Sequence, residues 1–219
     1  MIDYNLLAEA LPQLIIAAGK TLAIAFLSAS IGFIGGTIIA LLQMSANKLL
    51  NALLMTYVTI IRGTPMLLQI MFMYIMLPQF GINISAFATA VLAIGLNSCA
   101  YISQVIRSGI KSVNKGQIEA AQALGIKKFD LIRHIILPQA FIVVIPVLLN
   151  ELITLIKDSS LASLIGVIEL YKRGEIIISY SHNALLIYLC IGLIYLILTT
   201  TLTLFVNVIE NKINKYVGN

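Results

Sequence analysis

The sequence predicts an all-α integral membrane protein with five transmembrane helices. Of the 219 residues, 60% are hydrophobic and only 11% are charged, and the mean hydropathy is +1.01. A soluble domain of this size needs a larger share of polar residues. A helix of about 20 residues crosses a hydrocarbon layer about 30 Å thick. Five apolar stretches are long enough to do so, at about residues 11–42, 51–77, 85–106, 137–157 and 183–209.

The first three spans follow from where charges and turn residues fall. Residues 1–10 predict a short interfacial helix, and the segment from Thr21 to Leu42 in the first span has no charge. The second span is interrupted by Arg62. Turn-forming residues 78–83 separate the second span from the third, so a tight loop should make these two helices neighbours.

The connection between the third and fourth spans, residues 107–136, holds the densest charge. Glu119, Ala120 and Ala121 predict the start of a short helix, which Gly125 would end in a positive-φ conformation. Residues 127–134 predict a second short helix, and Pro138 suits the first turn of the fourth span. The later connection, residues 159–182, is apolar and then polar, which predicts a segment that dips back into the protein.

Lysine and arginine near span ends mark the cytoplasmic side. With residues 107–133 inside, nine basic residues are inside: Lys48, Arg107, Lys111, Lys115, Lys127, Lys128, Arg133, Lys212 and Lys215. Three are outside: Lys20, Lys172 and Arg173. The N-terminus is therefore predicted outside and the C-terminus in the cytoplasm of a multi-pass plasma-membrane protein. The net charge of +5 follows from this bias, so it does not indicate nucleic-acid binding.

The chain is predicted to be one membrane domain, residues 1–219, without catalytic chemistry of its own. It has no GxxxxGK[ST] phosphate loop, so ATP and Mg²⁺ would be bound by a separate subunit. Cys99 and Cys190 lie inside apolar stretches and predict neither a disulfide framework nor a metal site. No cofactor, metal or catalytic residue is therefore expected in this chain.

Ionisable residues inside spans predict a polar site there. Arg62, Glu151, Lys157 and Asp158 lie within or at the edges of spans, where each charge costs about 2.5 to 3.5 kcal/mol unless it is paired or hydrated. Glu151, Thr154 and Asp158 share one helical stripe, with the two carboxylates about 10 Å apart along the axis. The candidate substrate-binding residues are Glu151, Asp158, Asn97, Ser98, Tyr101, Thr154, Gln104, Met66 and Leu67.

Two readings of these charges remain open. In one, the carboxylates bind the ammonium and side-chain cation of a basic amino acid, while Asn97, Tyr101 and Gln104 offer neutral hydrogen-bonding groups. In the other, Arg62 or Lys157 neutralises Glu151 or Asp158 as a structural ion pair.

The charged connection also carries a spaced motif. Glu119-Ala120-Ala121 is followed at fixed intervals by Gly125, Ile135 and Leu137-Pro138. This pattern resembles, without a gap, the EAA signature of permease subunits of bacterial ABC importers. Similarity to the polar amino-acid uptake branch extends over nearly the whole chain. It includes Arg62-Gly63-Thr64-Pro65 with Gln69, Arg107-Ser108-Gly109-Ile110, and Lys157-Asp158-Ser159-Ser160-Leu161.

The resemblance implies partners and roles. The signature would form a coupling helix that docks on a cytoplasmic ATPase, through Glu119, Ala120, Ala121, Gly125, Gln117 and Leu124. Arg62, Gly63, Thr64, Pro65 and Pro138 would be structural motif residues. The other expected partners are a second permease copy, an extracytoplasmic binding protein that delivers the amino acid, and lipid. The fold would be that of a type I ABC importer permease.

Two other functions are considered. An ion-gradient-driven amino-acid transporter would use Glu151 or Asp158 as proton carriers and would need no ATPase. A membrane-embedded enzyme is disfavoured because no Ser/His/Asp, HExxH or paired Cys/His arrangement occurs in the spans. The sequence does not select among arginine, lysine, histidine, ornithine and neutral polar amino acids.

Overall fold

The computed structural model describes residues 4–44 and 47–217, and these residues are helical with no β-strand among them. The predicted all-α class is therefore confirmed. The α-helices are α1 (Tyr4–Gln43), α2 (Lys48–Gly63), α3 (Met66–Gln79), α4 (Ala86–Lys111), α5 (Lys115–Ala123), α6 (Lys128–Leu131), α7 (Leu137–Asp158), α8 (Leu170–Ser181) and α9 (Ala184–Val217). A π-helical segment (Ile132–Ile136) joins α6 to α7, and a 3₁₀ helix (Ser159–Ile165) follows α7.

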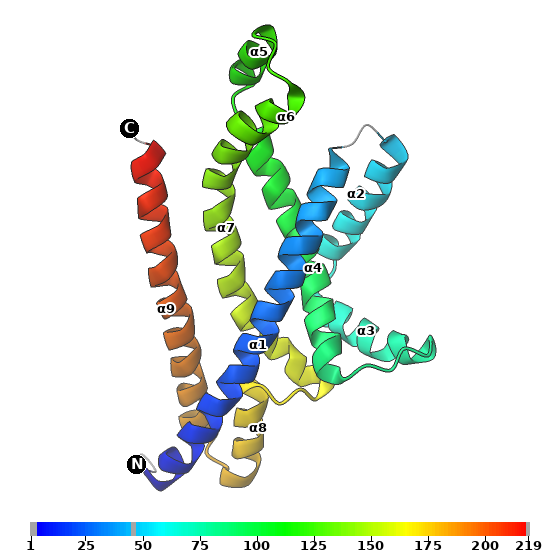
Figure 1. The fold of residues 1–219 in the computed structure, drawn as a ribbon. Helices are drawn as coiled ribbons and strands as arrows, with labels where there is room; N and C mark the ends of the chain where they lie inside the picture. The colour runs from blue at the N-terminus through cyan, green and yellow to red at the C-terminus, as the bar shows by residue number, and fades with distance from the viewer. Residues whose placement is uncertain (1–3, 45–46, 218–219) are drawn as a thin grey trace.

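Four helical stretches of the described chain are long and apolar enough to cross a membrane. They are Tyr4–Gln43, Ala86–Lys111, Lys128–Ile165 and Ala184–Ile213. α2 and α3 pass the same test together but are bent by 109°. The five predicted spans agree with this arrangement when the bent pair counts as one. In Figure 1, α3 projects sideways from the bundle, and α5 and the C-terminal end of α9 lie at the end opposite the start of α1.

α4 is the central helix and packs closely against α1. Its buried residues include Ile94, Asn97, Ser98 and Ile102. A Cβ atom placed on Gly36 of α1 would lie 2.8 Å from the Ile102 Cβ, too close for two carbons. Glycine therefore lets the two backbones approach closely. This contact fixes α4, and with it the residues that α4 presents to α2, α3 and α7.

The bend between α2 and α3 has a clear cause in the sequence. Pro65 precedes the first residue of α3 and has no N–H to continue the ladder of α2. The carbonyls freed at the end of α2 still need donors. Gln69 Nε2 supplies them, with hydrogen bonds to the Ile61 carbonyl at 2.8 Å and the Thr64 carbonyl at 3.1 Å. The break is thus a satisfied structural element.

Two local predictions need correction. Residues 4–10 are not a separate interfacial helix but the first turns of α1, and residues 1–3 lie outside the described residues. α1 continues through Pro12 because Leu6, Ala10 and Leu14 are buried in one apolar cluster with residues of α8 and α9.

The fourth span begins before Pro138. α6, the π-helical segment and α7 form one continuous helical stretch, instead of a short helix followed by a new span. The Leu137 N–H bonds to the Ile132 carbonyl, a five-residue step. This wider turn accommodates Pro138, which has no N–H for the regular ladder.

The connection of residues 159–182 is helical through most of its length. The 3₁₀ helix after Asp158 ends at Gly166, whose φ is +83°, and α8 follows from Leu170. Leu170, Gly174 and Ile177 are the buried face of α8. Backbone hydrogen bonds are therefore satisfied within this segment, which explains how it can return among the spans.

Candidate functional site: a polar pocket and an exposed helical projection

A polar pocket lies where the α2–α3 break, α4 and α7 meet. Its volume is about 320 Å³. The lining residues are Thr64, Pro65, Met66, Asn97, Tyr101, Glu151, Thr154 and Asp158. Six of these were predicted as substrate-binding residues, and Thr64 and Pro65 were predicted as motif residues. The stripes predicted on two separate helices therefore face one cavity, whose size suits a single small molecule.

Hydrogen bonds hold the lining side chains in place. Ser98 is fully buried and donates to Glu151 Oε1 at 3.1 Å. Asn97 Nδ2 donates to Gln69 Oε1 at 2.9 Å, which joins α4 to the start of α3. Gln69 therefore orients Asn97 and closes the helix break at once. The sequence motif included Gln69, but only the bend between α2 and α3 explains why its side chain is needed there.

The two carboxylates have no direct cationic partner. Within the described residues the ion pairs are His134–Asp130 at 4.0 Å and Lys172–Glu175 at 3.0 Å, both away from the pocket. Arg62 instead stacks over the Tyr101 ring, 5.1 Å from its centroid. Among the described residues, neither Arg62 nor Lys157 forms a direct ion pair with Glu151 or Asp158, although the charge of Lys157 still acts on Asp158, the next residue in the chain. The cavity lining holds two carboxyl groups and no Lys or Arg side chain.

The structure places the remaining predicted pocket residues elsewhere. Gln104 donates to Gln43 Oε1 at 3.1 Å, in a contact between α4 and α1 outside the pocket. Leu67 is 41% exposed and does not line the cavity. Both lie on helices that do reach the pocket, but a helical stripe does not show how far along the axis the cavity extends.

α5 forms an exposed projection at one end of the molecule (Figure 1). It begins after Asn114, whose side chain accepts the Gly116 N–H at 2.8 Å. Gly125 follows it with φ +73°, and the Ile126 N–H reaches the Ala121 carbonyl at 3.0 Å. The predicted glycine turn is confirmed. Glu119 does not begin this helix, however, but lies at its middle, because Asn114 caps it earlier.

The surface of the projection is apolar at its tip. Leu124 is 80% exposed and Phe129 is 69% exposed. Ala120 faces outward while Ala121 is buried, so only one of the two alanines lies on the outer face. Gln117 is tied to the long helical stretch that contains α7, because Gln139 Nε2 donates to its Oε1 at 2.7 Å. This bond joins the projection to the helical stretch that also carries Glu151 and Asp158.

Comparison with known proteins assigns the family. The profile of a family described as the inner membrane component of binding-protein-dependent transport systems matches residues 32–215. The chain belongs to this family. As an inner membrane component with several apolar helices, it is a multi-pass membrane protein.

Relatives of this transport component cover almost its whole length. The arginine transport system permease protein ArtQ of Bacillus subtilis is 37% identical over 97% of both chains. A putative glutamine transport system permease protein, GlnP of Rickettsia conorii, is 38% identical over 88% of both chains. A crystal structure of an amino acid ABC transporter with histidines contains a chain with 36% identity and a TM-score of 0.92, with 97% and 99% coverage.

Proposed function

We propose that this chain is the permease subunit of an ATP-driven importer for cationic amino acids. One observation carries the choice of substrate: Glu151 and Asp158 face a cavity of about 320 Å³, and neither has an ion-pair partner among the described residues. An arginine or lysine molecule would supply two cationic groups for two carboxylates. Neutral groups on Asn97 and Tyr101 are available for the substrate carboxylate. Named relatives for arginine and glutamine support an amino acid as the cargo.

The energy source is proposed to be a separate ATPase subunit docked on α5. The exposed Leu124 and Phe129 support this role, because apolar side chains at the tip of a polar projection are typical of interface anchors. Its ATP and Mg²⁺ would be bound by the partner. Nine basic residues against three favour a cytoplasmic α5, which places α8 and the start of α1 outside, where a binding protein delivers the solute.

Reconstitution tests this proposal. Purified chain in liposomes with its cognate ATPase and loaded binding protein should accumulate arginine when ATP is supplied, and should accumulate none without the ATPase. Uptake by the chain alone, driven by a proton gradient, would contradict the proposal and favour the ion-gradient transporter. Retained uptake of glutamine with none of arginine would leave the ATPase partner standing but overturn the cationic substrate.

A second copy of the chain is proposed to cover the open side of the pocket. The exposed polar residues of this region include Arg62, Asn150, Thr154 and Lys157. Facing lipid, each of the two cations would cost about 2.5 to 3.5 kcal/mol. A two-fold copy across a wet pathway removes that cost.

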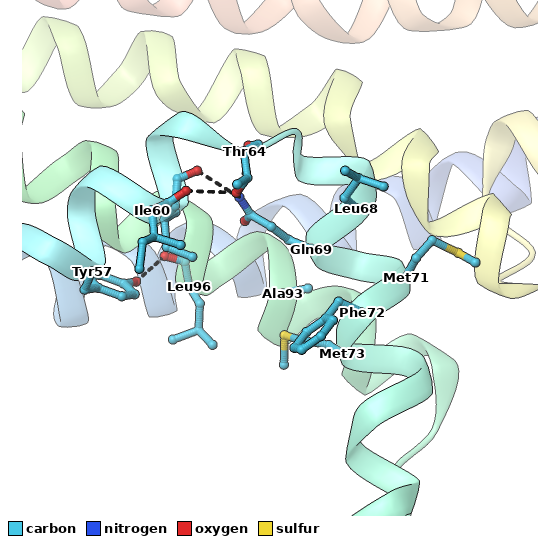
Figure 2. A pocket seen from close by; sticks show the side chains of 11 residues that line it. Tyr57, Ile60, Thr64, Leu68, Gln69, Met71, Phe72, Met73, Ala93 and Leu96 are labelled. Carbon is cyan, nitrogen blue, oxygen red and sulfur yellow. Dashed lines mark hydrogen bonds between the residues drawn. The ribbon is translucent and has the colours of Figure 1, made fainter.

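An apolar hollow next to the pocket supports the same interface. Its volume is about 820 Å³ and it lies inside the α2–α3 bend, lined mainly by apolar side chains such as Leu68, Phe72 and Leu96 (Figure 2). Thr64 lines both the hollow and the polar pocket. A two-fold axis along the membrane normal keeps each residue at its own depth. In the proposed dimer, the α2–α3 region of the second copy therefore packs against this hollow at the same depth in the membrane.

Cross-linking checks the second copy. Leu68→Cys, on an exposed residue of the hollow, should give a dimer-sized product with a short bis-maleimide in native membranes. The native cysteines are both buried, and Leu193→Cys on the equally exposed outer face of α9 is the matched control. A dimer formed through Leu193 and not through Leu68 would place the interface on α9 instead.

A further inference from the structure

A buried polar network lies between the pocket and α8, and none of its residues binds substrate or the ATPase in the proposed function. We call Thr21, Ser159, Glu169 and Tyr195 the α8 anchor network. Thr21, Ser159 and Glu169 each have no exposed surface. They come from α1, the start of the 3₁₀ helix and the residue before α8, and Tyr195 comes from α9. Residues up to 174 positions apart are thus joined at one point.

Glu169 is the centre of the network. Its Oε2 accepts hydrogen bonds from the Tyr195 hydroxyl at 3.1 Å and the Thr21 hydroxyl at 3.3 Å. The N–H groups of Tyr171 and Lys172 donate to its two oxygens at 2.9 and 2.8 Å, which caps α8. Burial raises the pKa of the Glu169 carboxyl, and these hydrogen bonds lower it.

Thr21 contributes a second bond to the same junction. Its hydroxyl accepts the Leu170 N–H at 3.1 Å while it donates to Glu169. The start of α8 is therefore attached to α1 by two bonds and to α9 by one. Burying a carboxylate costs free energy unless it is fully hydrogen-bonded. Loss of any one donor should therefore weaken the hydrogen bonds of the other members of the network.

The network reaches the wall of the pocket. The Tyr195 hydroxyl interacts with the side chain of Ser159, the residue that follows Asp158. Ser159 also bonds back to the Ile156 carbonyl at 2.8 Å, which fixes the last turn of α7. Ser159 thus stands between Tyr195 and the last turn of α7, which carries Asp158.

We infer that Glu169 and Tyr195 are positioning residues that connect the outer helix α8 to the Asp158 side of the pocket. The inference rests on the proposed function, in which α8 lies on the side where the binding protein arrives. The partly exposed Lys172 and Glu175, paired at 3.0 Å, are on α8 within two turns of Glu169. Docking of the loaded binding protein at α8 would thus act on Asp158 through Glu169, Tyr195 and Ser159.

Tyr195→Phe tests the inference because it removes one hydroxyl and leaves the apolar ring. In the complete transporter we expect the stimulation of ATP hydrolysis by loaded binding protein to fall at least fivefold. Basal ATP hydrolysis, measured without binding protein, should stay within twofold of wild type, since α5 is untouched. Tyr74→Phe, on a half-exposed tyrosine of α3 outside the network, is the matched control and should leave both rates unchanged.

A second variant guards against a folding effect. Thr21→Val removes the other hydroxyl and should reduce the same stimulation while basal hydrolysis persists. A parallel loss of basal and stimulated rates, in proportion to the folded fraction, would show a structural role only and overturn the inference. Unchanged stimulation in both variants would overturn it as well. If wild-type protein itself shows no stimulation, the proposed function fails, and the inference with it.

Discussion

Glu151→Gln should weaken arginine binding to the assembled transporter about 10- to 100-fold. The substitution keeps the size of the side chain and its ability to accept the Ser98 hydroxyl, which lies at 3.1 Å from Glu151 Oε1. It removes one of the two carboxyl groups from a cavity whose lining contains no Lys or Arg side chain. A hydrogen bond to a charged group contributes about 1.5 to 3 kcal/mol, which corresponds to this range of affinity.

The measurement is binding of labelled arginine to the ATPase-bound permease in detergent, without the binding protein. Glu175→Gln on α8 is the matched control, because its partly exposed pair with Lys172 is worth at most about 1 kcal/mol and lies outside the pocket. Wild-type affinity for arginine in the Glu151→Gln protein would remove the charge argument for a cationic substrate.

The sequence predicted the pocket well where one helix carries the information. Glu151, Thr154 and Asp158 share a stripe, and Asn97 and Tyr101 share another, and both stripes line the cavity. A helix has a fixed period, so residues three, four or seven apart must point the same way. Helical periodicity cannot show that the two stripes face each other. The free-energy cost of a charge inside a span suggested a shared polar site.

What the sequence did not predict depends on contacts between distant elements. In the sequence, Gln69 was noted only as part of a motif. The 109° bend places it beside the Ile61 carbonyl and Asn97, and this contact explains its role. Gln104 continued the stripe on α4, yet it lies beside Gln43 of α1 instead of the cavity. Glu169 was read as part of an apolar connection, and only the approach of α1 and α9 to α8 explains why a carboxylate is buried there.

Helix ends show the same limit. Gly125 was correctly predicted to turn with positive φ because only glycine adopts it at little cost. Pro138 was expected in the first turn of the fourth span, and it lies in the first turn of α7, but the helix also continues before it through a π-helical turn. Local preference identified both residues, while packing decided whether the helix stopped.

Leu124→Asp should abolish ATP-driven transport by detaching the ATPase. Leu124 directly follows α5 and is 80% exposed. Phe129, five residues later, is 69% exposed, so neither side chain contributes to the core of this subunit. Truncating or charging a central interface anchor commonly costs 2 kcal/mol or more, at least about 30-fold in affinity. Combining Gly125→Asp with Glu119→Lys should have the same effect, since Asp at φ +73° is strained and the charge of residue 119 is reversed.

Co-purification of the tagged permease with its ATPase measures this effect directly, and arginine uptake into liposomes reports its consequence. Leu124→Met is the matched control: it keeps an apolar side chain of similar volume and should retain both. Arginine binding to the pocket should persist in the Leu124→Asp protein, because Glu151 and Asp158 are on α7, away from the projection. An ATPase that still co-purifies with Leu124→Asp would show that the tip of α5 is not the docking surface. Loss of arginine binding in the same variant would mean that the substitution damages the fold and not the interface alone.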